Sequence, residues 1–441
     1  MTESEPGRVT AGDGETAGAW SPRAIWGLGL VLLAVTVGVC AVHLVRTQRR
    51  LTSRHLGAPR HRVDFEVFHT NAGVAAAGGD IYETHKQQRI YPYLYPPLLV
   101  SLLRPLAGIE LDWAVLLWNL LQLLMIPLGF ELLRRLLRSL GAPAPPLLAG
   151  VAVVLCTWFF VDNIEWAQVN LPVWLCVLGA LLTLRQDRLL VSGGLVALAV
   201  SLKLMPILLL LLLPALPVRR AGRWLGGFAV GLLVCGLLVP GLVNGFGWTW
   251  QMNGAFGDLL QRTALGSPQS LPWGNNCANH SLLFALHHGF GDCAPRHARL
   301  APYVITNLYL GLRLVVGLGT VATAVLLRWR GDRCAWSLAV AQLVLAMVLL
   351  NPITWIHHWV LLTVALGALA AAVYAPSLGS RARAVAAGLA LALAALSVAA
   401  PQLESFRTGT LSVAHFGVWL GITGLLLTLQ ISALRRPSAA G

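Results

Sequence analysis

Residues 189–218 read LLVSGGLVALAVSLKLMPILLLLLLPALPV, an apolar stretch with a single charged side chain, Lys203. A helix needs about 20 mostly apolar residues to cross a hydrocarbon core, and Pro206 interrupts this run. We therefore expect a hairpin of two helices with Lys203 at its apex. An ionisable side chain is expensive there, so the expected partner is an anion such as a lipid phosphate. The alternative is that Lys203 extends to the membrane interface.

The rest of the chain has the same character. Hydrophobic residues make up 56% of the 441 residues and charged residues 11%, against roughly 25% charged in soluble domains. The alternating pattern of a closed barrel is absent from the sequence. We predict an all-α polytopic membrane protein with about twelve spans. These lie near residues 24–45, 113–133, 146–161, 169–184, 189–203, 204–218, 224–243, 303–327, 335–350, 358–374, 384–400 and 411–433.

Arginine clusters recur in alternate segments between these spans, which is the positive-inside pattern with a cytoplasmic N-terminus. The formal charge of +14 is therefore ascribed to topology and not to nucleic acid. Residues 46–104 depart from the pattern, although loops longer than about 60 residues translocate with little regard to charge. We predict one transmembrane domain, residues 24–433, between cytoplasmic tails 1–23 and 434–441, with residues 24–45 as a retained signal anchor.

Two predicted outer loops, residues 46–112 and 244–302, are too long to be simple connections. In the first, residues 95–107 are apolar, short and rich in proline, so we expect an interfacial or re-entrant helix. The second contains Cys277 and Cys293, which would face an oxidising compartment. We predict a disulfide between them.

Polar motifs stand at the outer ends of the spans. Asp64 and Glu66 could supply a general base for an acceptor hydroxyl, or they are solvated loop acids. Tyr93, within a tyrosine-rich segment, suits a sugar platform or an interfacial belt. Arg89 beside it could pair with a phosphate.

Two further outer turns are polar. Residues 162–170 include Gln168 and Asn170, whose amides could bond to neighbouring helices or to a ligand. Residues 351–358 end in His357 and His358. Adjacent histidines on a helix point in different directions, whereas zinc pairs on helices stand four residues apart, so hydrogen bonds to phosphate or sugar are favoured over metal ligation. We expect no metal and no cofactor.

These motifs resemble glycosyltransferase family 87, bacterial polyprenyl-phosphate-sugar-dependent enzymes of the GT-C superfamily. The resemblance runs, in order, through Asp64-Phe65, Tyr93–Leu98, Gln168–Asn170, Lys203–Pro206, Asn279–Leu282 and Pro352–His358. His280 stands where the family pattern has Gln, and Asn351 where Ser is commoner.

The resemblance implies a GT-C-type fold and a polyprenyl-phosphate donor carrying mannose or arabinose on the outer face of the bacterial plasma membrane. It implies a lipid or envelope-glycan acceptor, with Asp64 as the base of an inverting displacement. The expected substrate-binding residues are Glu66, Arg89, Tyr93, Gln168, Asn170, Lys203, His280, Trp355, His357 and His358. No nucleotide is needed, and the sequence has no Gly-rich phosphate loop.

The main alternative is a transporter or flippase for lipid-linked sugars, which would also need many helices and a cation for the phosphate. Transporters tend to show internal repeats and binding sites near the bilayer midplane. Here no repeat is evident, and the polar residues are grouped at one predicted face. This pattern favours surface chemistry.

Overall fold

The computed structural model describes residues 21–53, 63–84, 91–265, 286, 302–351 and 354–399. Within these residues every regular element is helical, as the sequence predicts. The elements are α1 (Pro22–Ser53), α2 (Phe65–Ala76), α4 (Leu98–Leu103), η1 (Arg104–Leu106), α5 (Leu111–Ser139), α6 (Pro145–Leu155), α7 (Thr157–Glu165), α8 (Asn170–Arg185), α9 (Leu189–Leu202), η2 (Met205–Ala215), α10 (Val218–Leu232), η3 (Leu233–Leu238), α11 (Val239–Asn244), α12 (Phe246–Leu265), α14 (Pro302–Arg330), α15 (Arg333–Leu349), η5 (Ile356–Leu361), α16 (Leu362–Val373) and α17 (Ser380–Ala399).

Each of the first eleven predicted spans falls on one helix or on consecutive helices, and the twelfth, residues 411–433, lies outside the described residues. In the described part, five helices are long and apolar enough to cross a membrane. Helices α6 and α7, bent by 52° at a short break, raise that number to six if they form one span. The chain is a multi-pass membrane protein, and the number of twelve spans stays a prediction.

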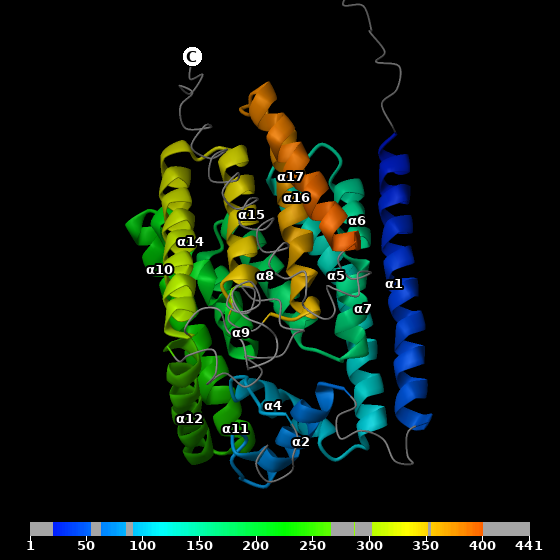
Figure 1. The fold of residues 1–441 in the computed structure, drawn as a ribbon, viewed down its shortest axis with the longest axis vertical. Helices are drawn as coiled ribbons and strands as arrows, with labels where there is room; N and C mark the ends of the chain where they lie inside the picture. Colours follow the sequence, from blue (N-terminus) through cyan, green and yellow to red (C-terminus); the bar gives the residue numbers. More distant parts are fainter. Residues whose placement is uncertain are drawn as a thin grey trace, which may run out of the picture.

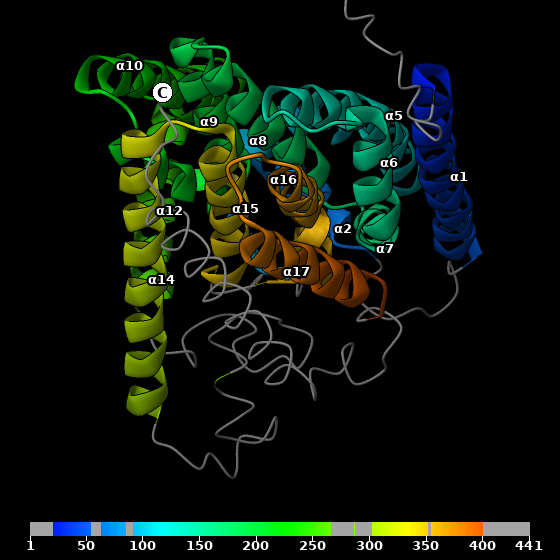
Figure 2. The same ribbon diagram turned by 90° about the horizontal axis from the view of Figure 1, so that it is seen from above.

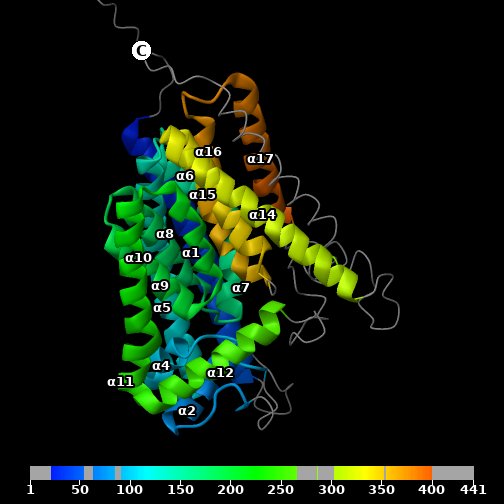
Figure 3. The ribbon, with the colours of Figure 1, turned by 90° about the vertical axis from the view of Figure 1, so that its left-hand side faces the viewer.

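Consecutive long helices run up and down, so alternate connections reach the same end of the bundle (Figure 1). Helix α1 finishes at the end that carries the small helices α2 and α4 together with α11 and α12, and we call it the site end. Seen from above, α1 and α14 lie on opposite flanks of the bundle (Figure 2). Figure 3 shows α14 leaning away from the other upright helices, while α12 crosses the site end obliquely.

The predicted hairpin in residues 189–218 is present. Helix α9 ends at Leu202, Lys203 is extended with φ −158° and ψ 128°, and η2 begins at Met205. Pro206 lies in the first turn of η2. A backbone N–H at this position has no acceptor within the helix, so the proline, which lacks one, fits there. The helix predicted within residues 95–107 is α4, which continues into η1. Whether it lies at the membrane interface stays a prediction.

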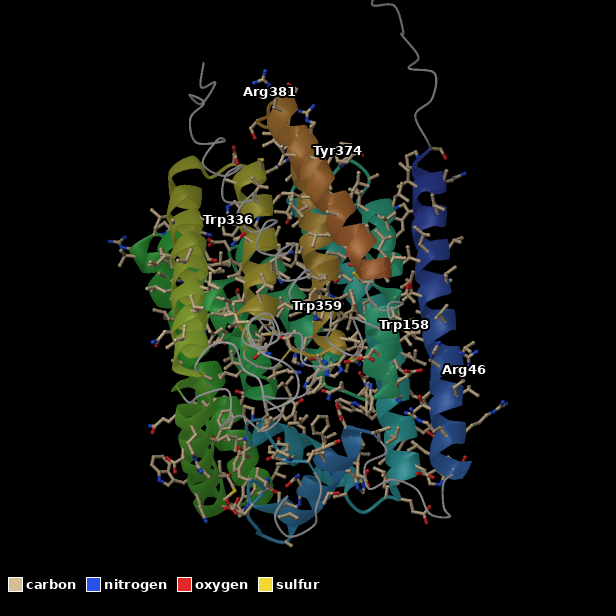
Figure 4. All side chains as sticks on the ribbon, viewed as in Figure 1. Arg46, Trp158, Trp336, Trp359, Tyr374 and Arg381 are labelled. Atoms are coloured by element: carbon tan, nitrogen blue, oxygen red, sulfur yellow. The ribbon has the colours of Figure 1, made fainter. Side chains whose placement is uncertain are left out.

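Side chains of α1 form hydrogen bonds to α7 at two levels of the bundle. The hydroxyls of Thr36 and Thr157 are 2.9 Å apart. Farther toward the site end, His43 Nδ1 lies 2.7 Å from Glu165 Oε1, and the His43 ring meets Trp158 edge to face. Trp158 marks this region in Figure 4. The predicted signal anchor is thus part of the folded bundle.

The centre of the bundle is filled by Trp174 on α8. Its ring is fully buried and packs edge to face against Phe160, and Nε1 donates to Thr363 Oγ1 on α16 at 2.8 Å. Gly129 on α5 makes room for it, because a Cβ there would fall 2.0 Å from the ring. One aromatic side chain therefore joins helices far apart in the sequence.

Large apolar side chains face outward along α1, α5 and α14, including Val31, Leu124 and Leu314. Leu124 is 70% exposed, which is expected where hydrocarbon is the solvent. Arg381, Tyr374 and Trp336 lie toward the end opposite the site end (Figure 4). Aromatic and arginine side chains are typical of the zone where a membrane helix leaves the hydrocarbon.

Candidate active site

Asp64 stands at the residue before α2, with its backbone already helical at φ −65° and ψ −25°. The buried ring of Phe65 packs against the ring of Trp118 on α5, with the ring centres 5.8 Å apart. The Phe65 N–H donates to the carbonyl of Trp166. These contacts attach the start of α2 to the turn between α7 and α8. The half-buried Asp64 carboxylate is not used as a helix cap and instead accepts a hydrogen bond from Gln168 Nε2.

Gln168 joins Asp64 to Tyr95. While its nitrogen donates to Asp64, its side-chain oxygen accepts from the Tyr95 hydroxyl at 3.2 Å. The turn that carries it is held by Trp118, whose Nε1 donates to the carbonyl of Ala167 at 3.1 Å. Ala167 has φ 50°, a left-handed conformation that residues other than glycine rarely adopt. The orientation of Gln168 is therefore fixed by packing and by a strained backbone.

Tyr95 lies close to both the Asp64 carboxylate and Lys203. Burial, and secondly the charge of Asp64, raise the pKa of the Tyr95 phenol well above its usual value. The phenol stays protonated and donates to Gln168. The ring of Phe68 meets the Tyr95 ring edge to face, with the ring centres 5.0 Å apart. The backbone carbonyl of Tyr95 accepts from the Tyr82 hydroxyl.

Lys203 lies over the ring of Tyr95. Its Nζ is 5.5 Å from the centre of the Tyr95 ring, donates to Asn170 Oδ1 at 2.8 Å and lies 2.5 Å from His358 Nε2. The side chain is 8% exposed. A buried ammonium needs polar partners, and those described for it are a neutral amide and an imidazole, together with the more distant charge of Asp64. An added anion would give the ammonium form of Lys203 the nearby charged partner that these two groups do not supply.

A chain of buried amides orients Asn170. Its Nδ2 donates to Asn163 Oδ1 at 3.1 Å, Asn163 donates to Gln122, and Gln122 donates to Asn119 Oδ1 at 3.0 Å. Each amide donates to the next, so the oxygen of Asn170 is left to face Lys203. The sequence analysis did not single out Asn119 and Gln122. The signal was available, because both interrupt the apolar run of residues 113–133.

The adjacent histidines point in different directions, as predicted. His358 Nε2 faces Lys203, and its Nδ1 accepts from the Trp355 N–H at 3.3 Å. His357 Nδ1 lies 3.0 Å from Asp162 Oδ2 on α7. The two rings are 4.9 Å apart, edge to face. Within the described residues no three His, Cys, Asp or Glu side chains are grouped as metal ligands; metal independence stays a prediction.

The remaining expected residues are less central. Tyr93 is buried between the rings of Tyr82 and Tyr95, and its hydroxyl donates to the carbonyl of Pro96. Glu66 is half-buried in the first turn of α2. Arg89, His280 and the predicted disulfide pair Cys277 and Cys293 lie outside the described residues.

The polar side chains of five separate segments therefore converge at the site end. Comparison with known families then decides what kind of protein this is, because the profile of glycosyltransferase family 87 matches residues 93–352, more than half of the chain. The chain belongs to glycosyltransferase family 87. The resemblance stated from its motifs is confirmed, and the protein is a membrane glycosyltransferase.

One similar protein is the polyprenol-phosphate-mannose-dependent alpha-(1-2)-phosphatidylinositol pentamannoside mannosyltransferase of Mycolicibacterium smegmatis. It is 25% identical over 309 residues, which are 68% of this chain and 67% of the relative. Gln168, Asn170 and Lys203 fall inside the region that the family profile matches. Asp64 precedes that region, and His357 and His358 follow it, so their roles are argued from geometry.

Proposed function

We propose that this glycosyltransferase moves mannose from a polyprenyl-phosphate donor to a lipid-linked or cell-envelope glycan acceptor, with inversion at the sugar and Asp64 as general base. The relative that depends on polyprenol-phosphate-mannose supports the donor. Arabinose is the second candidate for the sugar. The proposed location is the outer face of the bacterial plasma membrane, on a single GT-C-type domain spanning residues 24–433.

The proposal rests on a carboxylate and a lysine that lie close to the same tyrosine. Gln168 links the Asp64 carboxylate to the Tyr95 hydroxyl, and Lys203 Nζ lies 5.5 Å from the centre of the Tyr95 ring. Transfer from a lipid phosphate requires these two kinds of group, a base for the hydroxyl that attacks and a cation for the phosphate that leaves.

The proposed step is a direct displacement. The acceptor oxygen forms a bond to C1 of the sugar while the bond from C1 to the phosphate oxygen breaks. The electron pair of that bond leaves with the polyprenyl phosphate, whose charge changes from −1 to −2. Asp64 takes the proton of the acceptor hydroxyl, and Lys203 balances the charge that develops on the phosphate.

The proposal is tested with purified protein, radiolabelled polyprenyl-phosphate-mannose and a phosphatidylinositol mannoside acceptor. Wild type should transfer mannose, while Asp64→Asn should lose at least a hundredfold because general-base catalysis contributes about 10²–10⁴-fold. Asp258→Asn is the matched control, since Asp258 is an exposed acid on α12. Equal rates for Asp64→Asn and wild type would remove Asp64 from the mechanism. Lipid movement across vesicles without any transfer would instead support the flippase.

A further inference from the structure

Asp162 and His357 form a buried pair that the proposed step does not use. Asp162 lies on α7 and His357 in the first turn of η5, and Oδ2 of the aspartate is 3.0 Å from Nδ1 of the histidine. The imidazole is 4% exposed and the carboxylate 15%. The pair is therefore largely shielded from water, and the two groups act directly on one another.

The Asp162 carboxylate determines which ring nitrogen of His357 carries a hydrogen. An ionised carboxylate only accepts hydrogen bonds, so Nδ1 of His357 carries the hydrogen. Nε2 then points away from Asp162, and within the described residues this buried atom has no hydrogen-bond partner. A buried polar nitrogen without a partner is costly, and one at the edge of a polar site needs an explanation.

Neighbouring groups indicate what Nε2 would meet. The His357 ring touches that of His358, whose Nε2 faces the Lys203 ammonium. An imidazole that also carries a hydrogen on Nε2 donates from both ring nitrogens, one to Asp162 and the other to an added anion. An anion placed against this ring would also lie near Lys203.

We propose that Asp162 is a positioning residue that orients His357 through Nδ1, so that Nε2–H is presented to the phosphate of the lipid donor. This inference rests on the proposed function and adds a second phosphate contact to that of Lys203. The phosphate gains a full negative charge as the bond to C1 breaks, so this interaction is stronger in the transition state than in the ground state.

The other titratable groups around His357 do not compete for this role. On α7 the remaining acid is Glu165, which bonds to His43 of α1. The titratable groups of α8 are Cys176 in the middle of the helix and Arg185 at its last residue. Those of α15 are Arg333 and Cys334, at the start of that helix and away from the site end. Helix α16 has none, and η5 itself adds His358.

The structure supplies a matched control on the same helix. Glu165 follows Asp162 by three residues and also accepts from a histidine, with its Oε1 2.7 Å from His43 Nδ1. That pair faces α1 and not the site. Asp162→Asn and Glu165→Gln therefore remove one carboxylate charge each from similar pairs, and both replacements keep an oxygen that can accept from the histidine.

The experiment measures kcat and KM of mannose transfer from polyprenyl-phosphate-mannose for wild type, Asp162→Asn, Asp162→Glu and Glu165→Gln. Loss of the carboxylate leaves the His357 ring without the charged partner that orients it. The rate at neutral pH should fall about 10-fold to 100-fold, mainly in kcat, and Asp162→Glu should restore most of it.

Glu165→Gln should keep the wild-type kcat and KM. If Asp162→Asn matches Glu165→Gln in both constants, the proposal is overturned. A second measurement, binding of polyprenyl phosphate to the protein in nanodiscs, tests the phosphate contact separately from the proposed function. If wild type transfers no polyprenyl-linked sugar, the proposed function fails. Weaker binding of polyprenyl phosphate by Asp162→Asn than by Glu165→Gln would still support the phosphate contact, and equal binding would refute it.

Discussion

The ammonium group of Lys203 donates to the side-chain oxygen of Asn170 at 2.8 Å. This contact joins the break between α9 and η2 to the first residue of α8. Because the amide is neutral, it orients the lysine and leaves its charge in place. The contact is therefore suited to a site that is completed by an anion.

Replacing Lys203 should weaken both donor binding and transfer. Lys203→Met keeps the length of the side chain and removes its charge, so kcat/KM should fall about 10²–10³-fold, as when one charge-stabilising donor is removed from an active site. Steady-state kinetics with polyprenyl-phosphate-mannose measures the loss. Arg188→Gln, at an exposed position at the far end of α9, serves as control. A Lys203→Met enzyme with wild-type kinetics would exclude this lysine from the phosphate site.

Gln168 should control the proton affinity of Asp64. Gln168→Glu places a second carboxyl group against Asp64, and two adjacent carboxylates raise the pKa of one member of the pair. A general base must be deprotonated, so activity should be low at neutral pH and recover as pH rises. Gln168→Ala should lose activity without this shift. The acidic limb of kcat/KM for the two variants provides the measurement, and identical limbs would contradict the contact.

The buried amide chain should be needed for stability. Gln122→Leu removes the acceptor of Asn163 and the donor to Asn119, which should lower the free energy of unfolding by about 1–3 kcal/mol. Gln342 on α15 is a matched control, because it is equally buried and neither of its polar side-chain atoms has a partner within the described residues. Gln342→Leu should be neutral or stabilising. Thermal unfolding in detergent compares the two variants.

Gly129 should tolerate no side chain. In Gly129→Ala the new methyl group would meet the Trp174 ring, and overpacking of this kind costs about 1–3 kcal/mol. In Gly38→Ala on α1 the added Cβ meets nothing within 4 Å, so a neutral or slightly stabilising effect is expected. A lower Tm for Gly129→Ala alone, partly restored by Trp174→Leu, would verify the packing.

Transfer should not depend on a divalent cation. The proposed step assigns the phosphate charge to Lys203, and the proposed contact from His357 adds to it, so no metal is required for charge balance. Titration of the transfer assay with EDTA should leave the rate unchanged. Loss of activity with EDTA, restored by Mg²⁺ or Mn²⁺, would contradict this prediction.

The polar segments of the site could be predicted individually, because each stands at the outer end of a span or in a long outer loop. Lys203 was found by its charge, and His357 and His358 by their position at a turn. Their convergence followed from the up-and-down order of the helices. The pairing of Lys203 with His358 and of His357 with Asp162 depends on how each helix is rotated about its axis, which hydropathy does not encode.

Other features were harder to predict for a different reason. Asn119 and Gln122 belong to a run whose apolar character identifies a span but not the side chains it turns inward. The room for Trp174 depends on a glycine one helix away. Such contacts arise from packing between distant segments, so they become visible only in the assembled structure.

The bonds between α1 and α7 have a practical consequence for anyone expressing this enzyme. A first helix is often exchanged for a foreign leader to improve membrane targeting. Here Thr36 and His43 of α1 bind α7, the helix that carries Asp162, so such a replacement would remove part of the support of the candidate site. A correctly inserted but inactive fusion protein is the expected product.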